Sequence, residues 1–183
     1  MIPSIQEIKS LWEKYQLPPR KRRHLELVAQ VAKFLAAKCQ ALGVRCKVDY
    51  ELLNAAALLH DIDSAVPKLP GERHPDAGVR ILKAEGQEEI AELVKTHALH
   101  TILDQYSRPQ TWEAKLLFLA DKMVKDEIMT VDKRFALWRA EDLSGGEKQI
   151  LAASYPRVKE LEREILGIIK LKPEDISSLI REG

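Results

Sequence analysis

Apolar residues recur at helical spacing along almost the whole chain, and this pattern restricts the fold more than any other feature of the sequence. One face of the helix expected at residues 21–42 carries Val28, Val31, Leu35, Cys39 and Leu42. Gly43 follows, and glycine commonly ends a helix. Further helices are expected at about residues 4–16, 49–60 with Asp49 as its cap, 75–85, 88–100, 111–127, 130–141 and 148–170, before a short last helix. Since no segment reads as a β-hairpin, the sequence predicts an all-α fold.

The clearest internal break is Ser144-Gly145-Gly146, which reads as a turn and a helix cap. We therefore divide the chain into residues 1–142 and a C-terminal helical extension, residues 143–183. The extension carries an amphipathic helix at residues 148–170. We expect that helix either to pack on the core or to form an oligomer contact, as in a homodimer.

Composition excludes several classes of function. With 183 residues, 45% of them hydrophobic, the chain can bury a real core. Its 29 basic and 28 acidic side chains give a formal charge of +1, which argues against a general nucleic-acid or membrane-surface binder. No apolar run reaches membrane-spanning length, and the N-terminus lacks a signal-type apolar block, so we expect a cytoplasmic protein. Two cysteines, Cys39 and Cys46, make neither a disulfide framework nor a zinc pair.

Three of the expected helices carry a histidine at one end of their apolar face. These are His24 before Val28, His60 after Leu53 and Ala56, and His97 after Ile90 and Val94. One histidine of this kind is usually a hydrogen-bonded core residue. Here, however, Asp61 follows one of them, and Asp121 interrupts the apolar run at residues 116–124. A core has no need of such coincidences, whereas a metal site of imidazoles and carboxylates, suited to iron, manganese or zinc, requires them.

These residues resemble the signature of a known family. His24, the doublet His60-Asp61 and the later Ala120-Asp121-Lys122 resemble the H…HD…D pattern of the HD-domain phosphohydrolases. The resemblance covers roughly residues 11–137, about two thirds of the chain. It implies an all-helical bundle. It also implies a bound divalent metal: the simplest members hold one ion, and others add two histidines and hold two.

His74 in Arg73-His74-Pro75 and His97 in Thr96-His97 look like those two extra ligands. Only the resemblance identifies His74, since periodicity does not place it. The implied ligands are then His24, His60, Asp61, His74, His97 and Asp121, with Asp61 as the bridge. They would hold two ions, with iron or manganese expected first and zinc, cobalt, nickel or magnesium as alternatives.

Other residues follow from comparison with the family pattern. Many relatives carry glycine and then lysine soon after the doublet, where this chain has Asp63 and Ser64. Lys68 could replace that lysine, and Asp63 could orient a ligand or water, or simply cap a turn. The candidate substrate contacts are Lys68, Arg73, His100 and Lys122, with Lys95 and Arg108 as further positive groups. His100 is expected on the same helix face as His97.

The resemblance implies a metal-dependent phosphohydrolase that cleaves a phosphoester or phosphoanhydride bond with metal-activated water. His60, Asp61 and Asp63 are its expected catalytic residues. Its partner would be a small phosphorylated substrate, first of all a nucleotide. The chain lacks the Gly-Tyr-Pro signature of the branch that cleaves cyclic-di-GMP, so that activity is not assigned. Two alternatives stay open: a sensor that binds metal or nucleotide without turnover, and a di-iron oxygenase on the same fold.

Overall fold

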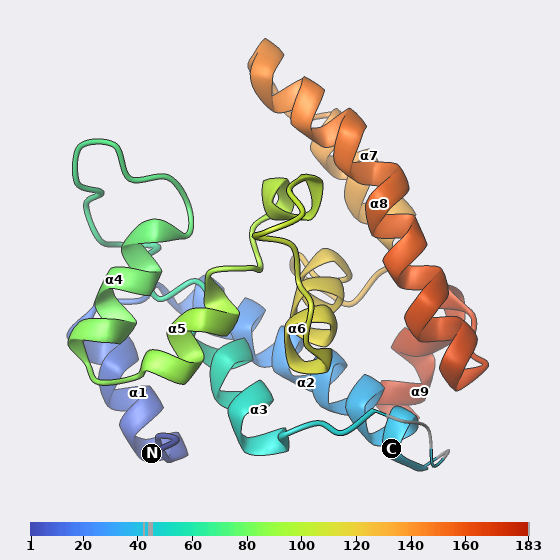
Figure 1. Cartoon of the computed structure of the whole chain (residues 1–183), viewed down its shortest axis with the longest axis horizontal. Coiled ribbons are helices and arrows are strands. Elements are labelled where there is room, and N and C mark those ends of the chain that lie inside the picture. The colour runs from blue at the N-terminus through green and yellow to red at the C-terminus, as the bar shows by residue number, and fades with distance from the viewer. Residues whose placement is uncertain (42, 44–45, 183) are drawn as a thin grey trace.

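The computed structural model of the chain describes residues 1–41, 43 and 46–182, and these residues form helices joined by loops (Figure 1). The α-helices are α1 (Ile5–Lys14), α2 (Pro19–Ala41), α3 (Tyr50–Leu59), α4 (Asp76–Ala84), α5 (Glu88–Val94), α6 (Trp112–Lys122), α7 (Val131–Arg139), α8 (Gly145–Ile169) and α9 (Ile176–Glu182). Two short 3-10 helices are η1 (Leu99–Leu103) and η2 (Pro173–Asp175). The described residues contain no strand, only an isolated bridge between Val124 and Ile128, so the expected all-α fold is confirmed. None of the described helices has both the length and the apolar character needed to cross a bilayer.

Polar side chains explain where several helices begin. Ser4 and Ser144 each accept a hydrogen bond from the backbone three residues ahead, and the glutamate there bonds back, which makes two capping boxes. The Asp49 side chain accepts a backbone N–H at the start of α3, as expected from the sequence. Thr111 and Thr130 cap α6 and α7 in the same way. Each such cap stabilises its helix by about 1 kcal/mol.

The central helix α2 packs against α3 and α6, and this packing builds the core (Figure 1). Val28, Val31 and Leu35, on the face predicted from periodicity, are completely buried. Helix α5 packs on α3, α4 and α6. Because the histidines lie at the ends of these packed faces, the same contacts that form the core bring the ends of α2, α3, α5 and α6 together.

The C-terminal helices share this core. Helix α8 lies beside α7 and also contacts η1, α6 and α2 (Figure 1). Val158 and Ile165 of α8 and Ile176 of α9 are buried in the same hydrophobic cluster as the rest of the bundle. The first turns of α8 extend past the bundle at the top of Figure 1. Most of α8 and the start of α9 thus pack on the core, while the division at residue 143 and a homodimer stay predictions.

The helix predicted at residues 88–100 is shorter than expected, and that prediction was wrong. Helix α5 ends at Val94, and the backbone N–H groups of Thr96 and His97 bond three residues back rather than four. The chain then becomes extended at Ala98 before η1 begins. His97 and His100 therefore lie in different elements, and the expectation that they share a helix face is also wrong. In this tight turn the Val94 carbonyl accepts both the backbone N–H of His97 and a hydrogen bond from the His97 ring.

The helix predicted at residues 111–127 also ends early, at Lys122. A turn over residues 124–128 follows, closed by the Val124–Ile128 bridge, and it directs the Lys125 carbonyl to the His24 ring. At the other end of the molecule, α2 is described to Ala41. Leu42, placed on its apolar face by the sequence pattern, lies outside the described residues.

Candidate metal centre

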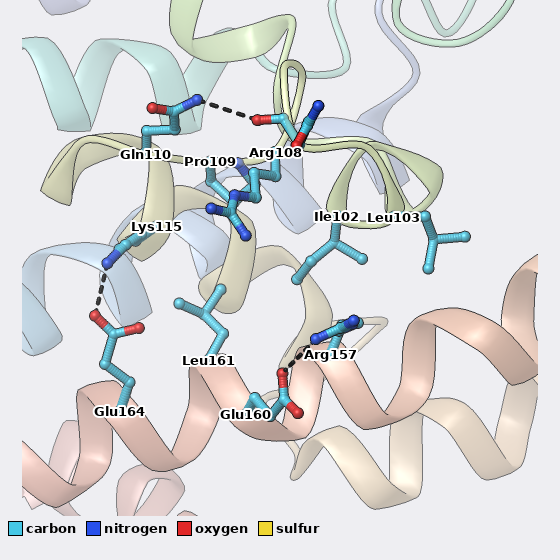
Figure 2. A pocket seen from close by; sticks show the side chains of 11 residues that line it. Ile102, Leu103, Arg108, Pro109, Gln110, Lys115, Arg157, Glu160, Leu161 and Glu164 are labelled. Atoms are coloured by element: carbon cyan, nitrogen blue, oxygen red, sulfur yellow. Dashed lines mark hydrogen bonds and ion pairs between the residues drawn. The ribbon is translucent and has the colours of Figure 1, made fainter.

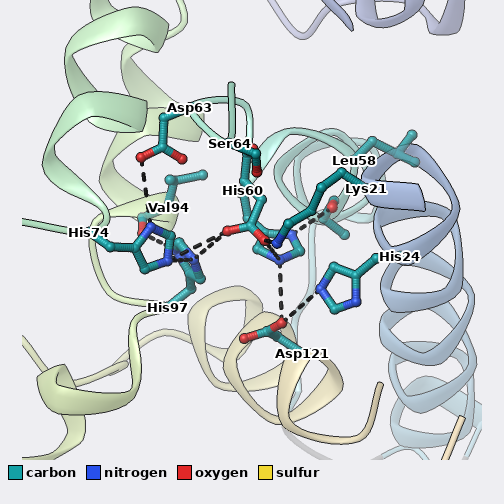
Figure 3. Close-up of polar contacts among 12 residues, drawn as sticks. Lys21, His24, Leu58, His60, Asp63, Ser64, His74, Val94, His97 and Asp121 are labelled. Carbon is teal, nitrogen blue, oxygen red and sulfur yellow. Dashed lines mark hydrogen bonds and ion pairs between the residues drawn. The ribbon is translucent and has the colours of Figure 1, made fainter. Parts of the chain in front are cut away.

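Side chains from five parts of the chain converge at one end of the bundle (Figure 3). They are His24 in α2, His60 and Asp61 directly after α3, His74 before α4, His97 after α5, and Asp121 in the last turn of α6. These are the six residues proposed as ligands from the sequence. The residues form three overlapping groups whose nitrogen and carboxylate oxygen atoms lie within 4.8 Å of one another, and Asp63 belongs to one of these groups.

The first group joins His24, His60 and Asp121. Nε2 of His24 lies 3.1 Å from Oδ1 of Asp121, and Nε2 of His60 lies 3.4 Å from the same oxygen. Figure 3 shows both rings turned toward this carboxylate. Ligand atoms bound at about 2.1 Å to one ion lie about 3.0–3.4 Å apart, depending on the coordination geometry. The spacing within this group therefore suits a shared ion.

The other two groups share Asp61, with His60 and His97 in one and Asp63 and His74 in the other. Oδ1 of Asp61 lies 3.5 Å from Nε2 of His74 and 3.6 Å from Nε2 of His97, and these two nitrogens are 2.9 Å apart. Oδ2 of the same carboxylate lies 3.8 Å from Nε2 of His60, which also belongs to the first group. Asp61 thus lies between His60 on one side and His74 and His97 on the other, which is the position that a bridging ligand requires.

Two of the histidine rings are held by the same kind of local hydrogen bond. Nδ1 of His60 donates to the carbonyl of Ala57 at 2.9 Å, and Nδ1 of His97 donates to the carbonyl of Val94 at 2.6 Å. In each case the acceptor is three residues back, at the end of a helix. A proton on Nδ1 leaves the lone pair on Nε2, so both rings present an acceptor to the centre.

The other two rings are oriented similarly. Nδ1 of His24 lies 3.3 Å from the carbonyl of Lys125, and Nδ1 of His74 lies 3.7 Å from Oδ2 of Asp63. Asp63 is itself buried. Metal-bound histidines typically direct their second nitrogen to a carbonyl or carboxylate in this way, which fixes the ring and its tautomer.

Two observations test whether these residues fit a metal. Nε2 of His60 is buried and has no hydrogen-bond partner among the described residues. In addition, Nε2 of His74 lies 2.9 Å from Nε2 of His97. Two imidazole nitrogens at this distance share either a proton or a cation. The buried imidazoles and carboxylates can therefore hold a metal, and this donor set suits iron, manganese or zinc.

Electrostatics at Asp61 favour a bound cation. Burial by itself raises the pKa of this carboxyl, but the charges of His60 and Lys21 and the adjacent His97 ring outweigh it and hold the pKa well below its ordinary value. At His97, burial lowers the pKa to about 4. The carboxylate is therefore ionised and the His97 imidazole neutral at pH 7, which are the forms that bind metal.

His60 experiences the opposite balance. Burial lowers the pKa of its imidazole, but the nearby carboxylates of Asp61 and Asp121 and the Nδ1 hydrogen bond to the Ala57 carbonyl more than offset this and raise it. The two carboxylates thus attract positive charge to the buried Nε2 atom. A proton or a metal ion can supply that charge.

Two lysines neutralise the carboxylates in the absence of metal. Nζ of Lys122 is 2.5 Å from Oδ2 of Asp121 and 2.7 Å from the carbonyl of His97, and the side chain is only 2% exposed. Nζ of Lys21 is 2.5 Å from Oδ2 of Asp61. Sequence reasoning missed Lys21, although its position one helical turn before His24 places both on one face of α2.

A cavity of about 640 Å³ opens onto this cluster. Of the predicted substrate contacts, Lys68 and Lys122 line it, together with Asp63. Arg73, Lys95 and His100 are exposed and do not line it. The Lys122 ammonium is already bonded to two oxygens of the protein. A substrate contact by Lys122, or by any other predicted contact residue, stays a prediction.

Arg108 lies elsewhere. It lines a second cavity, between the loop before α6 and helix α8, which the metal cluster does not share (Figure 2). Two ion pairs lie in the walls of that cavity: Lys115 of α6 with Glu164 of α8, and Arg157 with Glu160 within α8. Arg108 is therefore not one of the positive groups around the metal cluster.

Comparison with known proteins agrees with this geometry. The family model named HD domain matches residues 22–126, more than half of the chain, and this range includes all six cluster residues. No curated protein and no solved structure matches the chain significantly. The family is all-helical, as the chain is, and the buried cluster is compatible with a multi-histidine metal site of this family. The chain belongs to the HD-domain family.

Proposed function

We propose that this protein is a metal-dependent phosphohydrolase that cleaves a phosphoester or phosphoanhydride bond of a small phosphorylated substrate, first of all a nucleotide. Membership of the HD-domain family supports a reaction of the metal-dependent phosphohydrolase superfamily. The observation that carries the proposal is the convergence of four histidine Nε2 atoms on the carboxylates of Asp61 and Asp121 at the edge of a cavity. We also propose two ions per chain, iron or manganese first, because Asp61 lies between two ligand groups.

The proposed ligands divide between the two ions. One ion would be held by His24, His60, Asp61 and Asp121, and the other by Asp61, His74 and His97. Bound divalent ions would lower the pKa of water towards neutrality and neutralise charge on the phosphoryl oxygens. The protein's own part is to hold the rings rigidly through their Nδ1 atoms, with Asp63 orienting His74.

The cavity offers no strong nucleophile of its own among the described residues. Ser64 lines it, but its hydroxyl donates to the Asp61 carbonyl at 2.6 Å, and none of its hydrogen bonds involves a histidine. An activated serine needs a base within hydrogen-bond reach. Water is therefore the nucleophile in our proposal, which agrees with a metal-dependent hydrolase.

The test is a phosphate-release screen over nucleoside monophosphates, dinucleoside polyphosphates and cyclic nucleotides, with iron, manganese, cobalt and magnesium supplied in turn. We expect metal-dependent release from at least one class, lost in both His60→Ala and Asp61→Ala. Circular dichroism should show that both variants remain helical. Asp142→Asn, which neutralises an exposed carboxylate outside the cavity, serves as the control and should keep the activity.

The outcomes separate the competing functions. Nucleotide binding without turnover under every metal would support the sensor instead. Oxygen consumption together with a mixed-valent iron signal would support the oxygenase. Turnover that survives both variants would contradict the proposed mechanism.

A further inference from the structure

Arg134, on α7, is half-buried, and its guanidinium group lacks a hydrogen-bond partner in the described part of the chain. Its Nε and Nη1 atoms are buried and make no hydrogen bond. Burial of an unpaired charged group is unfavourable, and native proteins rarely keep one without a reason. The backbone N–H of Arg134 donates to the Thr130 carbonyl at the start of the helix, and this bond does not involve the side chain. The side chain therefore has unused donors.

The position of Arg134 relates it to the metal cluster. The side chain lines the same cavity as His24, Asp61 and Asp121. Its guanidinium carbon lies 4.0 Å from the centre of the Trp138 ring, one helical turn further along α7. A guanidinium stacked on an indole is held in a defined plane and keeps its N–H donors directed outward at the edges. Trp138 also lines the cavity, so the pair forms part of its wall.

The other cations of the cavity are either paired or hydrated. Their partners are Asp61 for Lys21, Asp121 for Lys122, Asp126 for Arg20 and Glu141 for Lys125. Lys68 is exposed, so water satisfies its ammonium. Among the described residues lining this cavity, Arg134 is thus the half-buried cation whose charge no carboxylate pairs with.

We propose that Arg134 is a substrate-binding residue of this cavity, which donates hydrogen bonds to the oxygens of a phosphate group while the metal cluster holds the reacting centre. A planar guanidinium matches phosphate geometry, and a charge-assisted bond to an anion would satisfy the unused donors. The identity of the anion as phosphate rests on the proposed function. The binding site itself does not, because it follows from the burial, stacking and placement of Arg134.

Binding of inorganic phosphate to the manganese-loaded protein tests this directly, by calorimetric titration and by thermal unfolding. We expect Arg134→Gln to weaken phosphate binding by about tenfold or more, the effect of losing a charged hydrogen bond. Its melting temperature without phosphate should be no lower than that of the wild type, since an unpaired buried charge is removed. The phosphate-induced rise in melting temperature should be largely lost.

Arg139→Gln is the matched control. Arg139 lies on the same helix and stacks on Tyr155 at 4.7 Å, but it is exposed and does not line the cavity. The control removes the same charge and should leave phosphate affinity unchanged. Arg134→Lys keeps the charge without the planar donor group and should bind phosphate more weakly than wild type. It also provides the binding test if Arg134→Gln fails to fold.

A parallel titration with pyrophosphate, at constant free Mn²⁺, locates the anion. A larger loss for pyrophosphate than for phosphate would place Arg134 on a second phosphate, and an equal loss would place it on the reacting one. The proposal is overturned if wild type binds neither anion, or if the Arg134 variants bind both as wild type does. A lower melting temperature with unchanged phosphate affinity would likewise show a purely structural role.

Turnover, measured separately, distinguishes this proposal from the proposed function. An inactive wild type that binds phosphate through Arg134 would contradict only the function. An active wild type whose phosphate affinity survives Arg134→Gln would contradict only the inference.

Discussion

Lys122→Met should destabilise the metal-free protein strongly, because Lys122 is a buried link between two elements of the metal centre. Its ammonium bonds to the Asp121 carboxylate and to the His97 carbonyl, so it connects α6 to the turn after α5. Methionine keeps much of the aliphatic stem and its packing on Phe118, whose ring centre lies 4.5 Å from Nζ. The substitution therefore removes mainly the charge.

The magnitude follows from what remains around Asp121. Removing one partner of a buried ion pair typically costs about 3–5 kcal/mol, since the other charge stays buried. Here His24 and His60 still approach the Asp121 carboxylate, which places the expected loss near the lower end, about 3 kcal/mol. For a chain of this size that loss lowers the melting temperature by about 6–12 °C.

Urea and thermal unfolding, followed by circular dichroism in a chelating buffer, measure this loss. Lys115→Met is the matched control on the same helix. Lys115 also pairs with a carboxylate, Glu164 at 2.6 Å, and lies over a ring, Trp112, but it is 23% exposed. We expect the control to lose less than about 1 kcal/mol. Equal losses in the two variants would refute the argument that burial makes Lys122 critical.

Two further predictions concern the rest of the fold. Burial raises the pKa of Glu162 despite its ion pair with Lys159, so its protonated form is favoured in the folded state, and that contribution is lost as pH rises through the folded pKa. Glu162→Gln should therefore be more stable than wild type at pH 7, by on the order of 1 kcal/mol, with the gain shrinking towards pH 4; a gain that grows on acidification would contradict this. Asp49→Ala should cost about 1 kcal/mol in urea unfolding because α3 loses its cap, and an unchanged midpoint would show that the cap is dispensable.

The helical stripes and most of the cluster could be predicted from the sequence because both depend on local spacing. His24 and His60 lie at the ends of buried helix faces, and burial confirms those faces. His97 was also found by periodicity, although the helix stops at Val94 and a turn carries the ring. The spacing of apolar residues carries no information about the hydrogen bond between the His97 ring and the Val94 carbonyl, so it does not show where the helix ends.

Residues placed by tertiary contacts could not be found in this way. His74 lies in a loop, so only the family resemblance suggested it. Lys21 had a weak signal in its spacing from His24, whereas Arg134 had none. Its missing partner, its stacking on Trp138 and its cavity all depend on how α7 packs beside the core. Sequence patterns can therefore identify candidate metal ligands, but they do not show which charged side chains pair across helices in the folded protein.

Elemental analysis of protein purified without chelators tests the central claim, that the six side chains form a metal centre. We expect two divalent ions per chain in the wild type, and a fall towards one in both His24→Ala and His74→Ala, which remove ligands from different groups. One ion in the wild type would support a mononuclear site instead. A wild-type protein without a divalent metal that also binds none when supplied with iron, manganese or zinc would contradict the account.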